Sequence, residues 1–217
     1  MKRIKGKNVL DTLAELLEPS RCALLVIDVQ NDFCLPDGHF GRHGRDMSLT
    51  TERLPTMVGT VQAAQAAGIF TVLVRQETLP EGRSDSAAWL RFKTRDGKTS
   101  DYTLPGTWGW RFVDGIEAGP RDAVVTKYRP DAFLNTNLEA LLRANGVETA
   151  VILGTTTEGC VESTVRGASY RDFYTVLVED AVATSDRALH EGSMRLMKAR
   201  YPSVTADELR AHWTGAP

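Results

Sequence analysis

Residues 150–166 read AVILGTTTEGCVESTVR, in which an apolar strand, a polar turn and the start of a helix follow one another directly. The apolar run ends at Gly154, and Cys160 stands where the helix is expected to begin. A helix N-terminus offers free backbone N–H groups and a partial positive charge, which favour a thiolate and can bind an oxyanion. The segment therefore predicts a nucleophile and its oxyanion site within one turn. The alternative is a small buried cysteine that packs a helix against a sheet.

Apolar runs and helical patterns alternate along the rest of the chain. Residues 22–29 form a continuous apolar run, which is typical of a strand buried on both faces. Strands alternating with helices predict parallel βαβ units, and therefore an α/β fold with a mainly parallel sheet covered on both sides. The other expected strands are 69–74, 123–126, 149–153, 175–179 and 202–204, and the expected helices are 50–67, 135–145, 186–200 and the one that contains Cys160.

The length and composition predict one globular domain over residues 1–217, in which residues 1–20 are an N-terminal helical extension. Residues 77–121 contain many Gly, Pro, Arg and Trp residues and little periodicity, which is typical of a functional loop region.

The net charge indicates which classes of partner to expect, and the cysteine content indicates the cellular compartment. The net charge of -2 gives no electrostatic reason to expect a nucleic acid or a membrane surface as a partner. No run of about 18 apolar residues is present, so no membrane span is expected. The three cysteines, Cys22, Cys34 and Cys160, lack the spacing of a disulfide framework or a structural zinc site. These features favour a protein of the reducing cytoplasm.

Two further polar residues stand at strand ends. Asp28 closes the apolar run at 22–29, and Lys127 follows the strand at 123–126. Because parallel strands carry their chemistry beyond their carboxyl ends, Asp28, Lys127 and Cys160 can meet in space as base, cation and nucleophile. The alternatives are an Asp28 that caps a loop through backbone N–H groups and a Lys127 that is solvated at the surface.

These segments carry a resemblance to a known family. Residues 25–34 (LVIDVQNDFC), 127–133 (KYRPDAF) and 154–166 resemble three ordered motifs of the isochorismatase-like cysteine hydrolases, and the similarity runs from about residue 20 to 205. The resemblance implies a Rossmann-like three-layer sandwich, an Asp28–Lys127–Cys160 triad and a homo-oligomer, commonly a dimer or tetramer. It also implies a cis Thr155–Thr156 peptide bond, which would aim the Thr156 N–H toward the Cys160 N–H to form the oxyanion hole.

Departures from other family members narrow the expected reaction. Nicotinamidases of the family bind a metal through an Asp-x-His pattern where this chain has Arg75-Gln76-Glu77, and its four histidines form no ligand set, so no metal or other cofactor is expected. The intact Cys160 favours amide chemistry. The chain thus resembles N-carbamoylsarcosine, biuret and ureidoacrylate amidohydrolases, which implies hydrolysis of a C–N bond in a small amide, carbamoyl or ureido compound through a thioester. The alternatives are an isochorismatase-type ether hydrolase and a non-catalytic protein that binds small molecules.

Substrate-binding residues are expected at strand ends and in the irregular segment. The candidates are Phe33, Arg75, Gln76, Trp108 and Trp110, together with Phe133 from the lysine motif. An arginine in the pocket would suit a carboxylate, whereas the two tryptophans have an alternative role in packing a loop core or a subunit interface. The Asp96-Gly97 and Pro105-Gly106 turns indicate loops that close over a small pocket.

Overall fold

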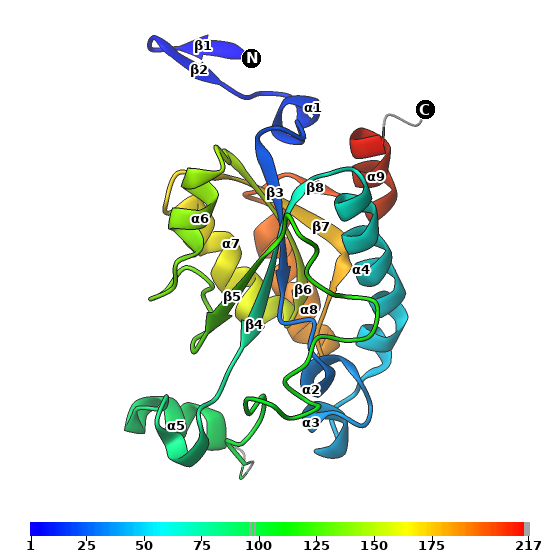
Figure 1. The fold of residues 1–217 in the computed structure, drawn as a ribbon, viewed down its shortest axis with the longest axis vertical. Helices are drawn as coiled ribbons and strands as arrows, with labels where there is room; N and C mark the ends of the chain where they lie inside the picture. Colours follow the sequence, from blue (N-terminus) through cyan, green and yellow to red (C-terminus); the bar gives the residue numbers. More distant parts are fainter. Residues whose placement is uncertain (96, 98, 215–217) are drawn as a thin grey trace.

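The computed structural model describes residues 1–95, 97 and 99–214. Six strands in these residues form one parallel sheet in the order β5-β4-β3-β6-β7-β8, which confirms the α/β class (Figure 1). No helix in the described parts of the chain is both long and apolar enough to cross a bilayer. The sheet strands are β3 (Cys22–Ile27), β4 (Phe70–Gln76), β5 (Ala123–Lys127), β6 (Thr149–Thr155), β7 (Tyr174–Ala183) and β8 (Ser203–Val204).

Helices cover both faces of the sheet because successive side chains of a strand point to opposite faces. On β3, Cys22, Leu24 and Val26 pack in the core that includes α4 and α9, whereas Ala23, Leu25 and Ile27 pack in the core that includes α6, α7 and α8 (Figure 1). The bounds are α4 (Ser48–Ala66), α9 (Ala206–Thr214), α6 (Leu138–Ala144), α7 (Glu162–Ser169) and α8 (Arg187–Lys198).

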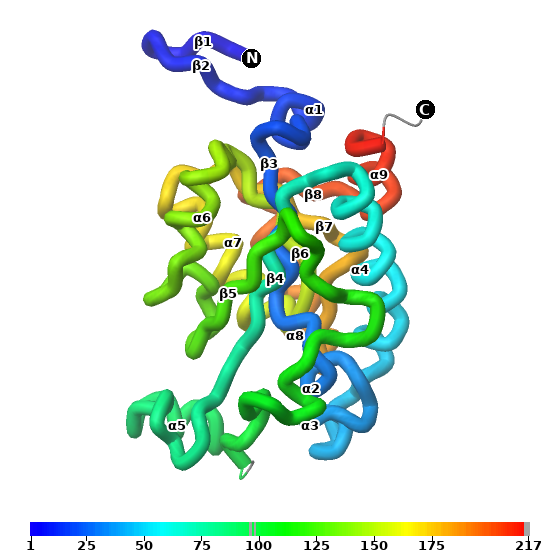
Figure 2. Tube along the Cα trace, viewed as in Figure 1, coloured from blue at the N-terminus to red at the C-terminus, as the bar shows by residue number. Residues whose placement is uncertain are grey.

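Three short helices gather at the end of the sheet where the strands finish, as both views of the chain show (Figure 1, Figure 2). They are α2 (Asn31–Cys34), α3 (His39–Arg42) and α5 (Ala87–Thr94). The helix α5 lies inside the segment expected to be irregular, after a 3-10 turn at Pro80–Gly82. Its N-terminus is capped by Ser86, whose Oγ accepts from the Trp89 N–H at 3.2 Å. None of its apolar residues is buried. The segment also shows little of the apolar periodicity by which a helix is recognised in a sequence.

The helical extension expected over residues 1–20 is wrong for most of its length. An antiparallel hairpin, β1 (Lys2–Ile4) and β2 (Lys7–Val9), occupies the start, and α1 covers only Leu13–Leu16. Lys5 and Gly6 form the two-residue loop of this hairpin. Both have positive φ, 48° and 81°, as a tight turn of this length requires. Thr12 and Glu15 then form the capping box that starts α1.

Candidate active site

The structure brings Asp28, Lys127 and Cys160 into direct contact at the carboxyl ends of three strands. Asp28 follows β3, Lys127 ends β5, and Cys160 lies in the turn after β6. The Lys127 Nζ lies 2.7 Å from Asp28 Oδ2 and 3.2 Å from Cys160 Sγ. It also donates to the Oε1 atom of Gln76 at 3.0 Å. Since an ammonium group has three hydrogens, each can face one of these three acceptors.

Neighbouring strands hold the backbone of Asp28 in place. Asp28 has a φ of 50°, in the left-handed region where aspartate is among the few residue types found repeatedly. Its N–H donates to the Val74 carbonyl at 2.9 Å, and its carbonyl accepts from the Thr155 hydroxyl at 2.8 Å. Contacts from β4 and β6 therefore turn the chain sharply at the end of β3 and direct the Asp28 side chain into the site.

Gln76 has a role that the sequence did not reveal. It was expected as a substrate-binding candidate, but its side-chain oxygen accepts from Lys127, and its amide nitrogen donates to the Glu77 carbonyl at 3.2 Å. Buried Gln30 pairs with the Gln76 backbone, accepting from its N–H at 2.8 Å and donating to its carbonyl at 3.0 Å. Gln30 stands in the motif at 25–34, yet nothing in its residue type indicates this partner.

The turn that carries Cys160 is a π-helix over Thr157–Val161, and α7 begins only at Glu162. The sequence predicted the first turn of a helix here, so the position is as expected but the helix type differs. The N–H groups of Gly159 and Val161 both donate to the Thr156 carbonyl at 3.1 Å. The peptide bond between Thr155 and Thr156 is cis. Thr156 and Cys160 both line the adjoining cavity.

Burial and mutual charge shift the pKa of all three groups. Burial raises the pKa of Asp28, although Lys127 acts in the opposite direction. Burial would by itself lower the pKa of Lys127, but the negative charges of Asp28 and Cys160 outweigh it and raise that pKa. Burial, with the adjacent Asp28, raises the pKa of the Cys160 thiol to about 12. The helix start favours the Cys160 thiolate, whereas desolvation and the nearby Asp28 act against it.

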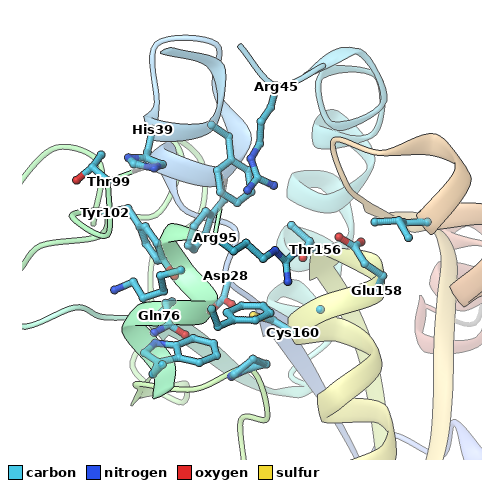
Figure 3. Close-up of a pocket in the computed structure, with 18 residues that line it drawn as sticks. Asp28, His39, Arg45, Gln76, Arg95, Thr99, Tyr102, Thr156, Glu158 and Cys160 are labelled. Atoms are coloured by element: carbon cyan, nitrogen blue, oxygen red, sulfur yellow. The ribbon is translucent and has the colours of Figure 1, made fainter. Parts of the chain in front are cut away.

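A cavity of about 330 Å³ opens above these residues (Figure 3). Asp28, Gln76 and Cys160 all line it, and so does the predicted Phe33. The figure shows His39, Thr99 and Tyr102 on one side, Thr156, Glu158 and Cys160 on another, and Arg45 and Arg95 directed toward the space between them. The cavity thus combines a buried set of reactive groups with a route for a small molecule.

Four predicted substrate-binding residues do not line this cavity. Arg75 precedes Gln76 on β4, so its side chain points to the other face of the sheet, where its guanidinium lies 3.8 Å from the Trp110 ring. Trp110 donates to Glu77 at 3.0 Å, and Trp108 is 44% exposed outside the cavity. Phe133 is buried with its ring 5.9 Å from that of Phe173.

Most of the cavity wall comes from residues that the sequence did not single out. Residues 77–121 were expected to be a functional loop region, and they supply Trp89, Phe92, Lys93, Arg95, Thr99 and Tyr102. Ordinary residue types on an exposed helix carry no signal of this role. Of the two turns expected to close over the pocket, the one at Asp96-Gly97 includes Asp96, which lies outside the described residues, and the Pro105-Gly106 turn is not part of the lining.

Comparisons with known proteins agree with this geometry. The family model described as the isochorismatase domain matches residues 22–208. The chain is 33% identical over 189 residues to a ureidoacrylate amidohydrolase from Methylobacterium radiotolerans, covering 82% of this chain and 73% of that protein. It is 30% identical over 175 residues to the ureidoacrylate amidohydrolase of Agrobacterium fabrum, covering 76% and 77%.

Solved structures show the same fold. A cysteine hydrolase from Pseudomonas syringae matches with a TM-score of 0.78 at 22% identity, over 92% of this chain and 95% of that one. The N-carbamoylsarcosine amidase from Thermoplasma acidophilum matches with a TM-score of 0.66 at 25% identity, over 86% and 97%. The family match spans most of the chain and includes all three strand-end residues. The chain therefore belongs to the isochorismatase family, in its amidohydrolase branch.

Proposed function

We propose that this protein hydrolyses a C–N bond of a small carbamoyl or ureido compound through a thioester on Cys160. The observation that carries the proposal is the position of the Lys127 ammonium, 2.7 Å from the Asp28 carboxyl and 3.2 Å from the Cys160 sulfur at the cavity. A nucleophile, a proton carrier and a fixed positive charge are the parts that covalent acyl transfer needs. The names of the ureidoacrylate relatives support the substrate class.

The reaction would start with proton transfer from Cys160 to Asp28, while the sulfur attacks the substrate carbonyl carbon. The backbone N–H groups of Thr156 and Cys160 would bind the oxyanion of the tetrahedral intermediate. As the C–N bond breaks, Asp28 returns the proton to the departing nitrogen and a thioester remains. Asp28 then takes a proton from water, the hydroxide attacks the thioester, and the proton returns to the Cys160 sulfur. Lys127 stabilises the negative charge wherever it resides in this sequence.

The shifted pKa values of Asp28 and Cys160 suit these proton transfers. Burial raises the pKa of Asp28. The pKa of the protonated carboxyl is therefore closer to that of the ammonium group formed when it protonates the departing nitrogen. The Cys160 thiol, whose pKa is raised to about 12, needs a base in contact with it at the moment of attack. Deprotonation would therefore be coupled to substrate binding.

We also propose that the reaction needs no metal ion. In the described residues, no group of three or more His, Cys, Asp and Glu side chains is arranged to hold one. Glu77, at the strand end where nicotinamidases of the family carry a metal-binding pattern, instead accepts from Trp110 and Tyr128 at 3.0 and 3.2 Å. Both of its carboxyl oxygens are thus engaged by the protein.

An ammonia-release assay on a panel of ureido acids, carbamoyl amino acids and simple amides tests the proposal. We expect turnover of at least one ureido or carbamoyl compound, no turnover by Cys160→Ala, and full activity after exhaustive treatment with EDTA. Circular dichroism checks that the variant is folded. Trapping of an acyl group on Cys160 at low pH, followed by mass spectrometry, tests the thioester. Substantial turnover by folded Cys160→Ala would refute covalent catalysis, and loss on chelation that zinc or iron restores would refute metal independence.

A further inference from the structure

We infer that the substrate carries an apolar group beyond its scissile bond, and that Trp89 and Phe92 of α5 contact this group. The inference rests on the proposed function only for the identity of the reacting end. It concerns the specificity of the cavity, which the family membership leaves open.

The lining combines polar groups at the reacting end with walls that carry both charged and aromatic side chains. Asp28, Gln76 and Cys160 provide the polar groups at the reacting end. One aromatic cluster in the lining consists of Phe33, Phe40 and Tyr102, with the Phe33 ring centroid 4.9 Å from that of Phe40 and 5.6 Å from that of Tyr102. A second consists of Trp89 and Phe92 on α5. A ligand that complements such a cavity has a polar reacting end and an apolar group that reaches the aromatic side chains.

The two α5 rings are held by stacking and not by burial. Their centroids are 4.8 Å apart and their planes differ by 14°. The guanidinium of Arg129 lies 5.0 Å from the Trp89 ring centroid, and that of Arg95 lies 4.5 Å from the Phe92 centroid. The four side chains form one continuous cation–aromatic stack, which restricts the ring rotamers before any ligand binds.

These rings do not contribute to the stability of the hydrophobic cores. Neither Trp89 nor Phe92 belongs to or packs against either core, and Phe92 remains 48% exposed. Leu189 on α8 also lines the cavity and is 51% exposed. Apolar side chains gathered at an open cavity indicate a surface that a ligand covers.

A matched pair of substrates tests the inference. N-carbamoylphenylalanine and N-carbamoylglycine share the ureido group and the carboxylate and differ only in the benzyl group. We expect kcat/KM for at least one enantiomer of the phenylalanine compound to exceed that of the glycine compound by about tenfold or more. Trp89→Ala and Phe92→Ala should abolish most of this preference by raising KM for N-carbamoylphenylalanine more than KM for N-carbamoylglycine. Trp89→Phe should retain it.

Trp108→Ala is the control, because Trp108 is a similarly exposed aromatic that does not line the cavity. It should leave the preference intact. Equal or better hydrolysis of N-carbamoylglycine by the wild type would overturn the inference while leaving the proposed function standing, and so would a preference that Trp89→Ala and Phe92→Ala do not change.

Protection of Cys160 from alkylation separates the two proposals if neither compound is hydrolysed. Cys22 and Cys34 are buried in the core, so alkylation of the folded protein reports on Cys160. Stronger protection by N-carbamoylphenylalanine than by N-carbamoylglycine, lost in Trp89→Ala, would support the aromatic site even then, while the full substrate panel decides ureido hydrolysis. Equal protection by the two compounds would overturn the inference.

Discussion

At the scale of single residues, the site depends on a buried lysine that contacts the Asp28 carboxyl and the Cys160 sulfur. Lys127 and Asp28 are 0% exposed, and a charge in such a place is stable only when it is paired. Asp28 and Lys127 both set the proton affinity of Cys160, in opposite directions. Asp28 raises the pKa of the thiol and Lys127 lowers it.

Asp28→Asn should separate thiol reactivity from turnover. An amide cannot take a proton, so hydrolysis should fall by about a hundredfold or more. Removing the negative charge should lower the pKa of Cys160, so alkylation at a fixed pH near 8 should become faster. The alkylation rate against pH and the ammonia-release rate of the same preparation measure the two effects. A variant that alkylates more slowly than the wild type would contradict the role of Asp28.

Lys127→Met should shift the pKa of Cys160 in the direction opposite to Asp28→Asn. Loss of the ammonium should raise the pKa of Cys160 further, so both alkylation and turnover should slow down. An alkylation profile that overlays that of the wild type would show that Lys127 exerts no electrostatic control over the sulfur.

At the scale of elements, α5 is held by contacts of the buried Lys93 side chain and by the stacking of Arg129 on Trp89. Lys93 and Asp85 have side chains only 1% and 2% exposed, with Nζ and Oδ2 2.9 Å apart. Lys93 also donates to the Thr78 hydroxyl at 3.2 Å and lies 4.4 Å from the Tyr102 ring centroid. Because no residue of α5 packs in either hydrophobic core, Lys93 and the Arg129–Trp89 contact position the wall that carries Trp89 and Phe92.

Lys93→Met should therefore loosen α5 while leaving the sheet intact. It leaves the Asp85 charge buried without its partner, which costs about 3 kcal/mol. Amide hydrogen exchange should accelerate over residues 87–94, and KM should rise more than kcat falls. The double variant Lys93→Met/Asp85→Asn removes both charges and should recover part of the protection. Unchanged exchange in Lys93→Met would show that α5 is held by other contacts.

At the scale of the whole molecule, one buried histidine makes the free energy of unfolding depend on pH. His190 is 6% exposed and its Nδ1 lies 2.8 Å from the Thr157 hydroxyl, in the turn that carries Cys160. Burial lowers the pKa of His190 from its ordinary value of 6.5 to about 4. The unfolded chain therefore binds a proton between about pH 6.5 and pH 4 that the folded protein does not bind.

The free energy of unfolding should fall as the pH drops through this window. His190 contributes full stability above about pH 6.5, and inside the window it loses about 1.4 kcal/mol per pH unit. Urea denaturation from about pH 7 to about pH 4.5 measures the slope. In His190→Gln, which keeps a hydrogen-bonding side chain without the titration, the slope should be smaller by about one proton. Equal slopes in the two proteins would show that His190 is protonated alike in both states.

The sequence by itself determined the sheet, the family and the three strand-end residues. Continuous apolar runs such as 22–27 have few structures open to them other than a strand buried on both faces, and the alternation with helices predicts parallel order. Asp28, Lys127 and Cys160 stand out because polar residues that end apolar strands converge at one edge of a parallel sheet. These inferences depend on local sequence patterns, which can be recognised without the tertiary structure.

Only the tertiary structure decided which side chains form the cavity and in which direction the pKa of Cys160 is shifted. Arg75 and Gln76 are adjacent in sequence, yet the pleat of β4 sends only Gln76 to the cavity. Trp89 and Phe92 lie on an exposed helix with little apolar periodicity, so their role depends on where contacts with Tyr102 and Arg129 place that helix. A helix start favours a thiolate, but the burial of Cys160 beside Asp28 outweighs it, and burial is a property of the packed molecule.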